Sequence, residues 1–286
     1  MPAAVEITNL SYTYSKKTPY EKKALEGICF SVEKGEFFGI VGSTGSGKST
    51  LISHLNGLLK KQQGSVKING LEVEKKNLKA VRSMVGMVFQ YPEYQLFEET
   101  VYKDVAFGPK NLRLQKDEID LRVKEALNLV GLDFDKYAER SPFELSGGEK
   151  RRAAIAGVLA MRPEILVLDE VAAGLDPEGK KDILALVKRL QKTMCPTVIF
   201  ISHNMDDVAS LCDRVAVLND GRLLTVGEPR AVFSDAKAII EAGLELPTAT
   251  LIQKKLENKG INFSKTAIKI EELAQMLLER RANSVS

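Results

Sequence analysis

The residues of this 286-residue chain that are best suited to chemistry form one glycine-rich segment. Glycines let backbone N–H groups gather around an anion, and the N-terminus of a following helix adds a partial positive charge. In such a loop, Lys48 is expected to reach the β- and γ-phosphates of a nucleotide, and the Ser49 hydroxyl to bind Mg²⁺. The segment fits the pattern G-x-x-x-x-G-K-[ST] and comprises Gly42, Ser43, Thr44, Gly45, Ser46, Gly47, Lys48 and Ser49, with Thr50 directly after it.

The sequence on either side of this segment separates two interpretations of it. A glycine-rich turn that opens an ordinary helix is the simpler one. Residues 37–41 are apolar and strand-like, however, and residues 50–55 are helix-like. Because strand, loop and helix in that order form the context of a phosphate-binding loop, we expect the chain to bind a nucleotide.

An acidic pair follows a second apolar segment. Residues 165–168 are all aliphatic, and Asp169 and Glu170 come directly after them. A parallel sheet gathers functional groups at the carboxyl ends of its strands, where a phosphate loop also lies. We expect Asp169 to assist Mg²⁺ binding, and Glu170 to orient an attacking water or accept its proton. A surface Asp-Glu pair is the alternative, and a neighbouring phosphate loop makes it the weaker one.

A third segment precedes a helix-like stretch at residues 150–160. Ser-Gly-Gly before a helix forms a second anion-receptive N-terminus. The alternative is an ordinary capping box, in which a serine caps the helix and a glutamate lies three residues further on. Taken alone, the segment favours the cap. It consists of Leu145, Ser146, Gly147, Gly148 and Glu149.

Strands and helices in alternation must position these segments. Residues 5–10 and 64–70 alternate between apolar and polar side chains, which is typical of strands. The alternation of strands with helical stretches predicts an α/β fold with a mostly parallel sheet and helices on both faces. Buried strands are predicted for the apolar runs at residues 86–89, 165–168, 197–201 and 214–218.

Two parts of the chain depart from this alternation. Residues 92–161 are mostly helical and form an insertion, in which one amphipathic helix ends before Gly131. After about residue 234, two further amphipathic helices are predicted as a C-terminal extension. From the residues alone, we expect this extension to be a packing appendage. Its apolar positions are Leu251, Ile252 and Leu256, then Leu273, Met276 and Leu277.

The composition narrows the classes of function. A net charge of +3, from 41 basic and 38 acidic residues, is too small to indicate nucleic acid, so no nucleic-acid partner is expected. We expect Cys29, Cys195 and Cys212 to be buried small residues in a reducing compartment. The sequence has no signal peptide pattern and no apolar run long enough to span a bilayer. Work at a membrane would therefore require a partner.

Taken together, these segments resemble the ATP-binding-cassette (ABC) ATPases over about residues 4–235. The resemblance implies a P-loop nucleotide-binding domain at residues 1–235 and a C-terminal helical extension at residues 236–286, which in this family helps to hold the ATPase pair together. It also implies an antiparallel β portion at the N-terminus and a helical subdomain at about residues 92–161. ATP and Mg²⁺ are the implied substrate and cofactor.

The resemblance also assigns roles to single residues. Gln90 resembles the glutamine that contacts Mg²⁺. His203 resembles the switch histidine that contacts the γ-phosphate; its alternative is a cap on the next helix. Tyr14 lies about where the family stacks an aromatic ring on adenine, with Tyr12 as a competing choice. The family's signature and D-loop are matched by Leu145, Ser146, Gly147, Gly148 and Glu149, and by Gly174, Leu175 and Asp176.

The sequence differs from the family pattern in two places. Glu149 ends the signature where glutamine is usual. Val171 and Ala172 follow the acidic pair in place of the usual Pro-Thr or Pro-Ser. Neither change removes a phosphate ligand, so hydrolysis is still expected. In this family two cassettes pair head to tail, which implies that the signature serves the ATP bound by a partner.

Several stretches are similar to the ATPase subunits of energy-coupling-factor transporters, most closely to the second of two paralogous ATPases. The resemblance implies a heterodimer with the first paralogue, a transmembrane coupling protein and a substrate-binding membrane protein. It implies a peripheral location on the cytoplasmic face of the cell membrane and uptake of a vitamin, cobalt or nickel. The stretches are residues 91–101, 104–109, 141–144 and 243–247.

Three interpretations compete with these expectations. A soluble cassette protein that acts on ribosomes or DNA usually has two fused cassettes or a long coiled coil, and the sequence has neither. A regulatory subunit that binds ATP without turnover conflicts with intact Lys48, Asp169, Glu170 and His203. For residues 91–97, which contain two tyrosines and a phenylalanine, docking of the coupling protein and core packing are equally favoured.

Overall fold

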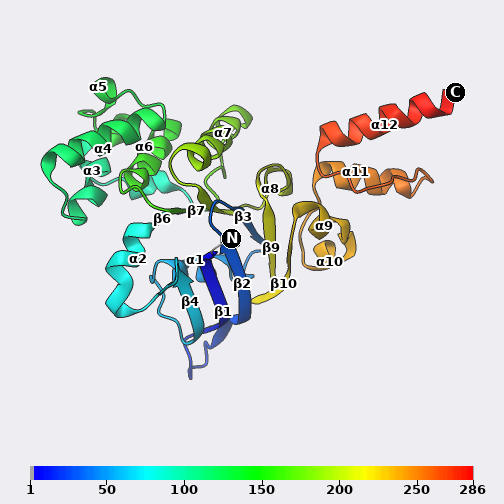
Figure 1. The fold of residues 1–286 in the computed structure, drawn as a ribbon, viewed down its shortest axis with the longest axis horizontal. Helices are drawn as coiled ribbons and strands as arrows, with labels where there is room; N and C mark the ends of the chain where they lie inside the picture. The colour runs from blue at the N-terminus through cyan, green and yellow to red at the C-terminus, as the bar shows by residue number, and fades with distance from the viewer. Residues whose placement is uncertain (1–2, 286) are drawn as a thin grey trace.

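Two β-sheets form the centre of the computed structural model, which describes the backbone of residues 3–285 and the side chains of residues 3–280 (Figure 1). The smaller sheet is antiparallel, with the strand order β2-β1-β4-β5. Its presence confirms the implied N-terminal β portion. The strands are β1 (Ala3–Tyr14), β2 (Lys22–Glu33), β4 (Gln63–Ile68) and β5 (Leu71–Glu72).

The larger sheet carries the candidate site. Its order is β10-β9-β3-β8-β7-β6, and all of these strands run parallel except β10, which pairs antiparallel with β9. Strands buried on both faces are nearly continuous apolar runs, which explains why the sequence revealed them. The strands are β3 (Phe37–Gly42), β6 (Val85–Val88), β7 (Ile165–Asp169), β8 (Thr197–Ile201), β9 (Arg214–Asn219) and β10 (Arg222–Gly227).

Each face of the larger sheet contributes to its own apolar core, because successive side chains of a strand point to opposite faces. Phe37 packs into a core shared with helices α3, α4, α6, α7 and α8. Phe38 packs into a second core, which α1 and the smaller sheet complete. One face is thus covered by helices, and the other by a helix together with a sheet.

The helices that follow the first strands include the predicted insertion. Two of them precede it: α1 (Lys48–Leu55) and α2 (Leu78–Met84), the latter after the 3₁₀ turn η1 (Lys75–Asn77). Between β6 and β7 the described chain is entirely helical or irregular, as expected. The insertion contains η2 (Pro92–Gln95), α3 (Val101–Asn111), α4 (Lys116–Leu129), α5 (Phe134–Tyr137), η3 (Pro142–Glu144) and α6 (Gly147–Leu159).

The last helices run from the larger sheet into a projecting C-terminal arm (Figure 1). The two predicted amphipathic helices are confirmed as α11 and α12, and two short helices that the sequence did not reveal precede them. The helices are α7 (Pro177–Thr193), α8 (Met205–Leu211), α9 (Pro229–Ser234), α10 (Ala236–Glu241), α11 (Thr248–Glu257) and α12 (Ile270–Val285).

A buried amide holds the arm together where apolar packing is sparse. Gln253 is 2% exposed, and its side chain accepts from the Ala267 N–H at 2.6 Å and donates to the Lys265 carbonyl at 3.1 Å. A small apolar cluster of Ala249, Ala267 and Leu273 lies beside it. The arm is joined to the body by Thr248, whose N–H and hydroxyl donate to Asp206 at 2.8 and 2.6 Å.

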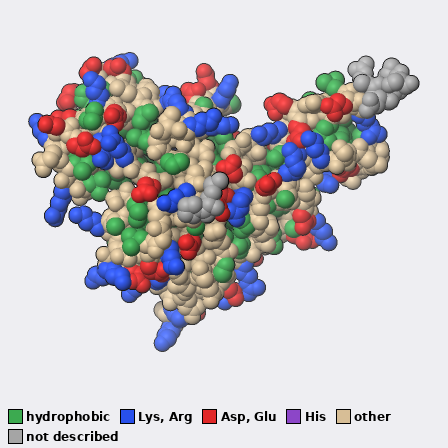
Figure 2. Space-filling view, viewed as in Figure 1, with side chains coloured by type: hydrophobic (Ala, Val, Ile, Leu, Met, Phe, Trp, Pro, Cys, Tyr) green, Lys and Arg blue, Asp and Glu red, His purple; other side chains and the backbone are tan. Residues whose placement is uncertain are grey.

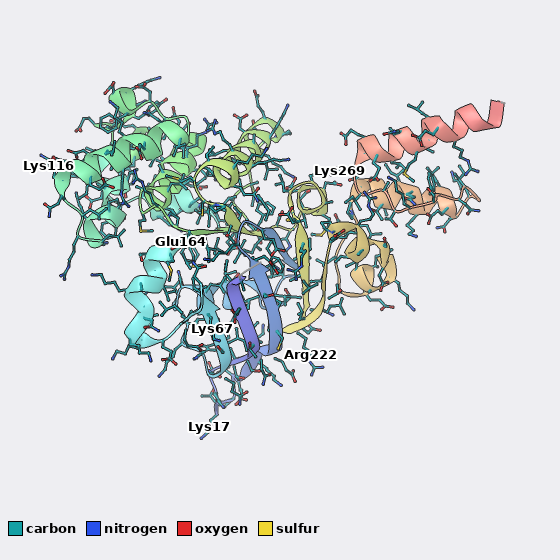
Figure 3. The ribbon with its side chains drawn as sticks, in the orientation of Figure 1. Lys17, Lys67, Lys116, Glu164, Arg222 and Lys269 are labelled. Atoms are coloured by element: carbon teal, nitrogen blue, oxygen red, sulfur yellow. The ribbon has the colours of Figure 1, made fainter. Side chains whose placement is uncertain are left out.

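The surface is mixed in charge. In the view of Figure 2, acidic and basic side chains are interspersed over the helical insertion and the arm. Figure 3 shows Lys116, at the start of α4, and Lys269, just before α12, on opposite sides of the sheets. No helix in the described part of the chain is long and apolar enough to cross a membrane.

The expectation of three buried cysteines was wrong for one of them. Cys195 and Cys212 are buried, and burial raises the pKa of the Cys195 thiol to about 12. Cys29 is exposed, because its strand turns this side chain away from both cores. Its sulfur accepts a hydrogen bond from the Asn9 N–H at 3.0 Å, beside an irregularity in the β1–β2 pairing.

The core that joins the two sheets supplies a stability test. Phe38 is fully buried and stacks on Phe30 at a centroid distance of 5.3 Å. Phe38→Ala should lower the free energy of unfolding, measured in urea, by about 3–5 kcal/mol. Tyr20 is 84% exposed, so Tyr20→Ala should change the free energy by less than about 1 kcal/mol. Equal losses would contradict the assignment of this core.

Candidate functional site

The glycine-rich segment forms the turn between β3 and α1. Gly47 caps α1 with a φ of 103°, and a Cβ at this position would lie 2.6 Å from the Ala24 carbonyl oxygen, so only glycine fits. Ser46 is 1% exposed, and its hydroxyl has no hydrogen-bond partner among the described residues. A buried donor without a partner is costly, and an anion in the loop would satisfy it. The loop therefore has the backbone shape and the free donor that phosphate binding requires.

Lys48 is the charged group of this loop. It is 7% exposed, and its ammonium donates to the carbonyl oxygens of Gly42 at 2.7 Å and Ser43 at 3.0 Å. Burial lowers the pKa of Lys48, and the charges of Glu170 and Asp169 partly oppose this shift. Within the described chain, no carboxylate lies within ion-pair distance of the ammonium, so its charge is available to an anion.

The acidic pair ends β7 at the carboxyl edge of the sheet. Asp169 is 9% exposed, and burial, followed by the charge of Glu170, raises its pKa to about 6. Glu170 has a φ of 51°, a left-handed conformation that costs about 1–3 kcal/mol in a residue other than glycine. Its N–H donates to the Ile201 carbonyl at 3.0 Å, which holds this conformation in place. Strain of this kind is typical of functional positions.

Two side chains from neighbouring strands converge on Glu170. Gln90 follows β6 and donates through Nε2 to one carboxylate oxygen at 2.9 Å. His203 follows β8, and its Nε2 lies 2.8 Å from the other oxygen. The sheet order places β7 between β8 and β6, which brings all three side chains to the same edge. The carboxylate is thus held from both sides, and a cavity of about 170 Å³ opens beside it and His203.

A second cavity, of about 320 Å³, lies along the phosphate loop and α1. Tyr14 lines it, whereas Tyr12 does not. The Tyr14 hydroxyl lies 3.1 Å from the Thr50 hydroxyl, and the Tyr12 ring packs edge-on between Tyr14 and the buried His54. Tyr12 and His54 therefore support Tyr14 from behind. Lys22 also lines this cavity, and no sequence signal pointed to it.

The segment at residues 145–149 forms a capping box at the start of α6. The Ser146 hydroxyl accepts from the Glu149 N–H at 3.3 Å, and the Ser146 N–H donates to the Glu149 carboxylate at 2.8 Å. The Tyr137 hydroxyl donates to the same carboxylate at 2.6 Å, and these bonds lower the pKa of Glu149 to about 2. The predicted cap is confirmed. Tyr137 could not have been found from the sequence, because it lies on a separate helix.

The structure does not bring this segment to the phosphate loop of its own chain. None of residues 145–149 lines either cavity, and a Cβ built at Gly147 or Gly148 would meet nothing within 4 Å. Gly174, Leu175 and Asp176 lie just before α7, where the Asp176 carboxylate caps the helix by accepting from Gly179 at 3.0 Å. The site of this chain therefore comprises the phosphate loop, the acidic pair, Gln90 and His203.

The pKa of Asp169 supplies a pH test. Its value of about 6 lies above the ordinary carboxyl value of 3.8, so the folded state binds the extra proton and loses stability as the pH rises between the two values. Asp169→Asn removes this loss. The variant should gain about 3 kcal/mol of unfolding free energy over wild type at pH 7.5, and about 1 kcal/mol at pH 4.5. Urea denaturation at both pH values measures the difference. An equal change at both pH values would contradict the shift.

Comparison with known proteins agrees with this geometry. A family model described as "ABC transporter" matches residues 25–173. The energy-coupling factor transporter ATP-binding protein EcfA2 of Clostridium tetani is 50% identical over 278 residues, 96% of each chain. The protein of the same name from Acetivibrio thermocellus is 51% identical over 274 residues, covering 96% of this chain and 97% of the relative.

Solved structures show the same fold. The cbiO1 structure from Clostridium perfringens, described as part of the ABC transporter complex cbiONQ, has a TM-score of 0.75 and 38% identity, and the match covers 90% of this chain and all of that one. The dimeric ATP-binding cassette MJ0796 bound to ADP and Pi has a TM-score of 0.69 and 29% identity, over 79% of this chain and 99% of that one. The chain therefore belongs to the ABC transporter family and, within it, to the ATP-binding proteins of energy-coupling factor transporters.

Proposed function

We propose that this chain is the ATP-hydrolysing subunit of an energy-coupling factor transporter and that it powers uptake of a vitamin or a transition-metal ion. The observation that carries the proposal is the convergence of Gln90 and His203 on Glu170, at the sheet edge that also bears the phosphate loop. The names of the relatives support the transporter assignment. Nothing in the described site favours a soluble cassette with a non-transport partner.

In the hydrolysis reaction, each group of the site has a distinct role. Lys48 and the backbone N–H groups of residues 42–50 hold the β- and γ-phosphates of ATP. The Ser46 hydroxyl, which has no partner among the described residues, can donate a further hydrogen bond to a phosphate oxygen. Glu170 orients the attacking water and accepts its proton. His203, already hydrogen-bonded to Glu170, contacts the γ-phosphate and keeps the carboxylate in position. The Tyr14 ring, which lines the cavity along the phosphate loop, stacks on the adenine base.

The residues that would hold Mg²⁺ are Ser49, Gln90 and Asp169. Their hydroxyl, amide and carboxylate oxygens are the hard ligands that this ion prefers. In the described residues, no three His, Cys, Asp or Glu side chains gather into a metal site by themselves, which fits an ion bound largely through nucleotide phosphates. Bound Mg²⁺ would neutralise charge on the transferred phosphoryl group. The raised pKa of Asp169 supports the fit, because a nearby cation favours the ionised carboxylate.

The outward-facing signature implies a partner cassette. Leu145, Ser146, Gly147, Gly148 and Glu149 are remote from the cavities of this chain, and the two glycines leave open space above the helix N-terminus. We assign this surface to the γ-phosphate of ATP held by a paralogous ATPase subunit, as in a head-to-tail pair. Gly174, Leu175 and Asp176 would lie in the same interface.

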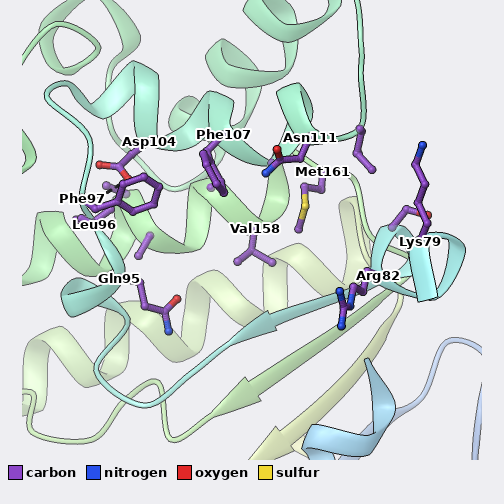
Figure 4. Close-up of a pocket in the computed structure, with 16 residues that line it drawn as sticks. Lys79, Arg82, Gln95, Leu96, Phe97, Asp104, Phe107, Asn111, Val158 and Met161 are labelled. Carbon is purple, nitrogen blue, oxygen red and sulfur yellow. Dashed lines mark hydrogen bonds between the residues drawn. The ribbon is translucent and has the colours of Figure 1, made fainter. Parts of the chain in front are cut away.

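A groove between α2, η2, α3 and α6 is the proposed docking site for the transmembrane coupling protein (Figure 4). Its volume is about 610 Å³. Phe97 and Phe107 meet edge-to-face at 5.0 Å at one end, and Lys79 and Arg82 lie at the other. Tyr91, Tyr94 and Phe97 are 42%, 84% and 59% exposed, which favours docking over core packing for residues 91–97. The groove is lined chiefly by Gln95, Leu96, Phe97, Phe107, Gly108, Ala153, Val158 and Met161.

We propose a division of the chain that matches these roles. Residues 1–235 form the nucleotide-binding domain, with residues 92–161 as its helical subdomain, and residues 236–286 form an extension that helps to pair the ATPases. Exposed apolar side chains in residues 236–280 support this role for the extension: Ile240, Leu251, Ile252, Ile270 and Leu278. Docking on the coupling protein, which also contacts the substrate-binding membrane protein, would place the chain on the cytoplasmic face of the cell membrane.

The catalytic role of Glu170 is tested in the assembled complex. Glu170→Gln keeps the size of the side chain but cannot accept a proton, so the rate of phosphate release should fall by at least about 100-fold. Equilibrium ATP binding should change by less than about twofold, since the phosphate ligands remain. The exposed Glu178 supplies the matched control, and Glu178→Gln should hydrolyse ATP normally. Wild-type turnover by Glu170→Gln would refute the role of this carboxylate.

Docking in the groove is tested by co-purification. Phe107 is 44% exposed, and Phe107→Glu places a charge against apolar surface, so recovery of integral membrane proteins from detergent extracts should fall about tenfold or more. Leu121 is 48% exposed on α4 and lies outside the groove, so Leu121→Glu should retain full recovery. If wild type recovered only ribosomal or nucleic-acid partners, the transport function would be wrong.

A further inference from the structure

One buried guanidinium connects three parts of the molecule that the proposed function uses separately. Arg151, on α6, is 3% exposed. Its Nε and Nη2 donate to the two carboxylate oxygens of Glu93 at 3.2 and 2.9 Å. Its Nη1 donates to the carbonyl oxygens of Val171 and Ala173, both at 3.0 Å. Four hydrogen bonds in a fixed fork leave this side chain little freedom to reorient.

Each end of this network belongs to a functional segment. Glu93 lies in η2, within residues 91–97, whose last members line the groove. Val171 and Ala173 form the turn directly after Glu170. Arg151 itself lies on the first turns of the helix that the signature opens. Docking segment, catalytic turn and signature helix therefore meet at one cation.

The pair resists separation because both charges are largely removed from water. Burial raises the pKa of Glu93, but the hydrogen bonds from Arg151, a backbone hydrogen bond and the Arg151 charge together outweigh it and hold the pKa below the ordinary value. If residues 91–97 moved without the turn at 171–173, the cation would be left buried and partly unpaired, which is strongly unfavourable. The segments are thus expected to move together. The Tyr91 ring also lies beside the end of this turn, because a Cβ built at Gly174 would be 3.7 Å from it.

The turn that Arg151 holds is also the place where the sequence departs from the family pattern. Val171 and Ala172 replace the usual Pro-Thr, so no proline ring restricts the backbone after Glu170. The bonds from Arg151 to the carbonyls of Val171 and Ala173 supply the restraint from outside. The position of Glu170 thus depends on a side chain from the signature helix.

We propose that Arg151 is a positioning residue, which transmits occupancy of the groove to Glu170 and to the signature. This role rests on the transport function proposed above. Glu93 is its partner in this role. Arg151 lines neither cavity of the site, so it acts through the segments that it joins.

The test uses Arg151→Lys, which keeps the charge but loses the bidentate fork. The stimulation ratio is the ATP hydrolysis rate of the complex with its membrane partners divided by the rate without them. In Arg151→Lys this ratio should fall about tenfold, whereas the KM for ATP should stay within about twofold of the wild-type value. Glu93→Gln should lower the ratio similarly, and the double variant should lose no more than either single one, because both act through one contact. An unchanged ratio in Arg151→Lys, or losses that add in the double variant, would overturn the proposal.

The next residue of the same helix is the matched control. Arg152 pairs with Asp182 on the surface, where its Nη2 lies 3.0 Å from an oxygen of the Asp182 carboxylate. The Arg152 side chain is 33% exposed and the Asp182 side chain 56%. Arg152→Lys should keep the stimulation ratio within about twofold of wild type, because an exposed pair contributes little. Equal effects of Arg151→Lys and Arg152→Lys would also overturn the proposal.

Hydrogen exchange on the full chain alone separates this link from the transport function. Arg151→Lys should speed exchange at residues 91–97 and 171–174 together, by about fivefold or more, with the β3 and β8 amides unchanged. Exchange that rises in one segment only would refute the link. If wild-type hydrolysis showed no response to membrane partners, the transport function would fail, and this measurement would still decide the role of Arg151.

Discussion

The parallel register of β6, β7 and β8 is the constraint on which the site depends. Val88 pairs with Leu168, and Asp169 with Ile201, so the three strands end in line and their next residues meet at one edge. Gln90 and His203 then lie on either side of Glu170 and hold its carboxylate from two directions. A shift of one strand by a single residue would turn its side chains to the opposite face and dismantle this arrangement. The two apolar cores prevent such a shift, since each strand is packed on both faces.

The same sheet also explains why the phosphate loop and the signature occupy two separate surfaces. The carboxyl edge gathers the phosphate loop, the acidic pair and the two residues that flank it, whereas the signature lies at the start of α6 in the helical insertion. Tyr137 and Glu149 fix that helix N-terminus independently of the loop. In the head-to-tail pair proposed above, two preformed surfaces would meet with little local rearrangement of either. Pre-organisation of this kind lowers the entropic cost of association.

The local patterns of the sequence predicted the parallel strands, the phosphate loop, the acidic pair and the cap at Ser146, because each depends on residues adjacent in the chain; they did not predict β2, β5 or β10. These patterns could not predict contacts between segments that are distant in the chain. The network around Arg151 joins residues 58 and 20 positions apart, and the support of Glu149 by Tyr137 crosses between helices. No spacing rule encodes such contacts. Cys29 shows the converse error: composition suggested burial, but the outcome depended on which face of an edge strand the side chain occupies.

The unpaired hydroxyl of Ser46 has a consequence beyond catalysis. Together with the buried carboxyl of Asp169, it leaves the nucleotide site with polar groups that a bound ligand would satisfy. A ligand that binds only the folded chain adds to its stability in proportion to the logarithm of its concentration. The nucleotide supply of a cell therefore influences how long a newly made copy survives proteolysis before it finds its partners, as well as how fast it works once assembled.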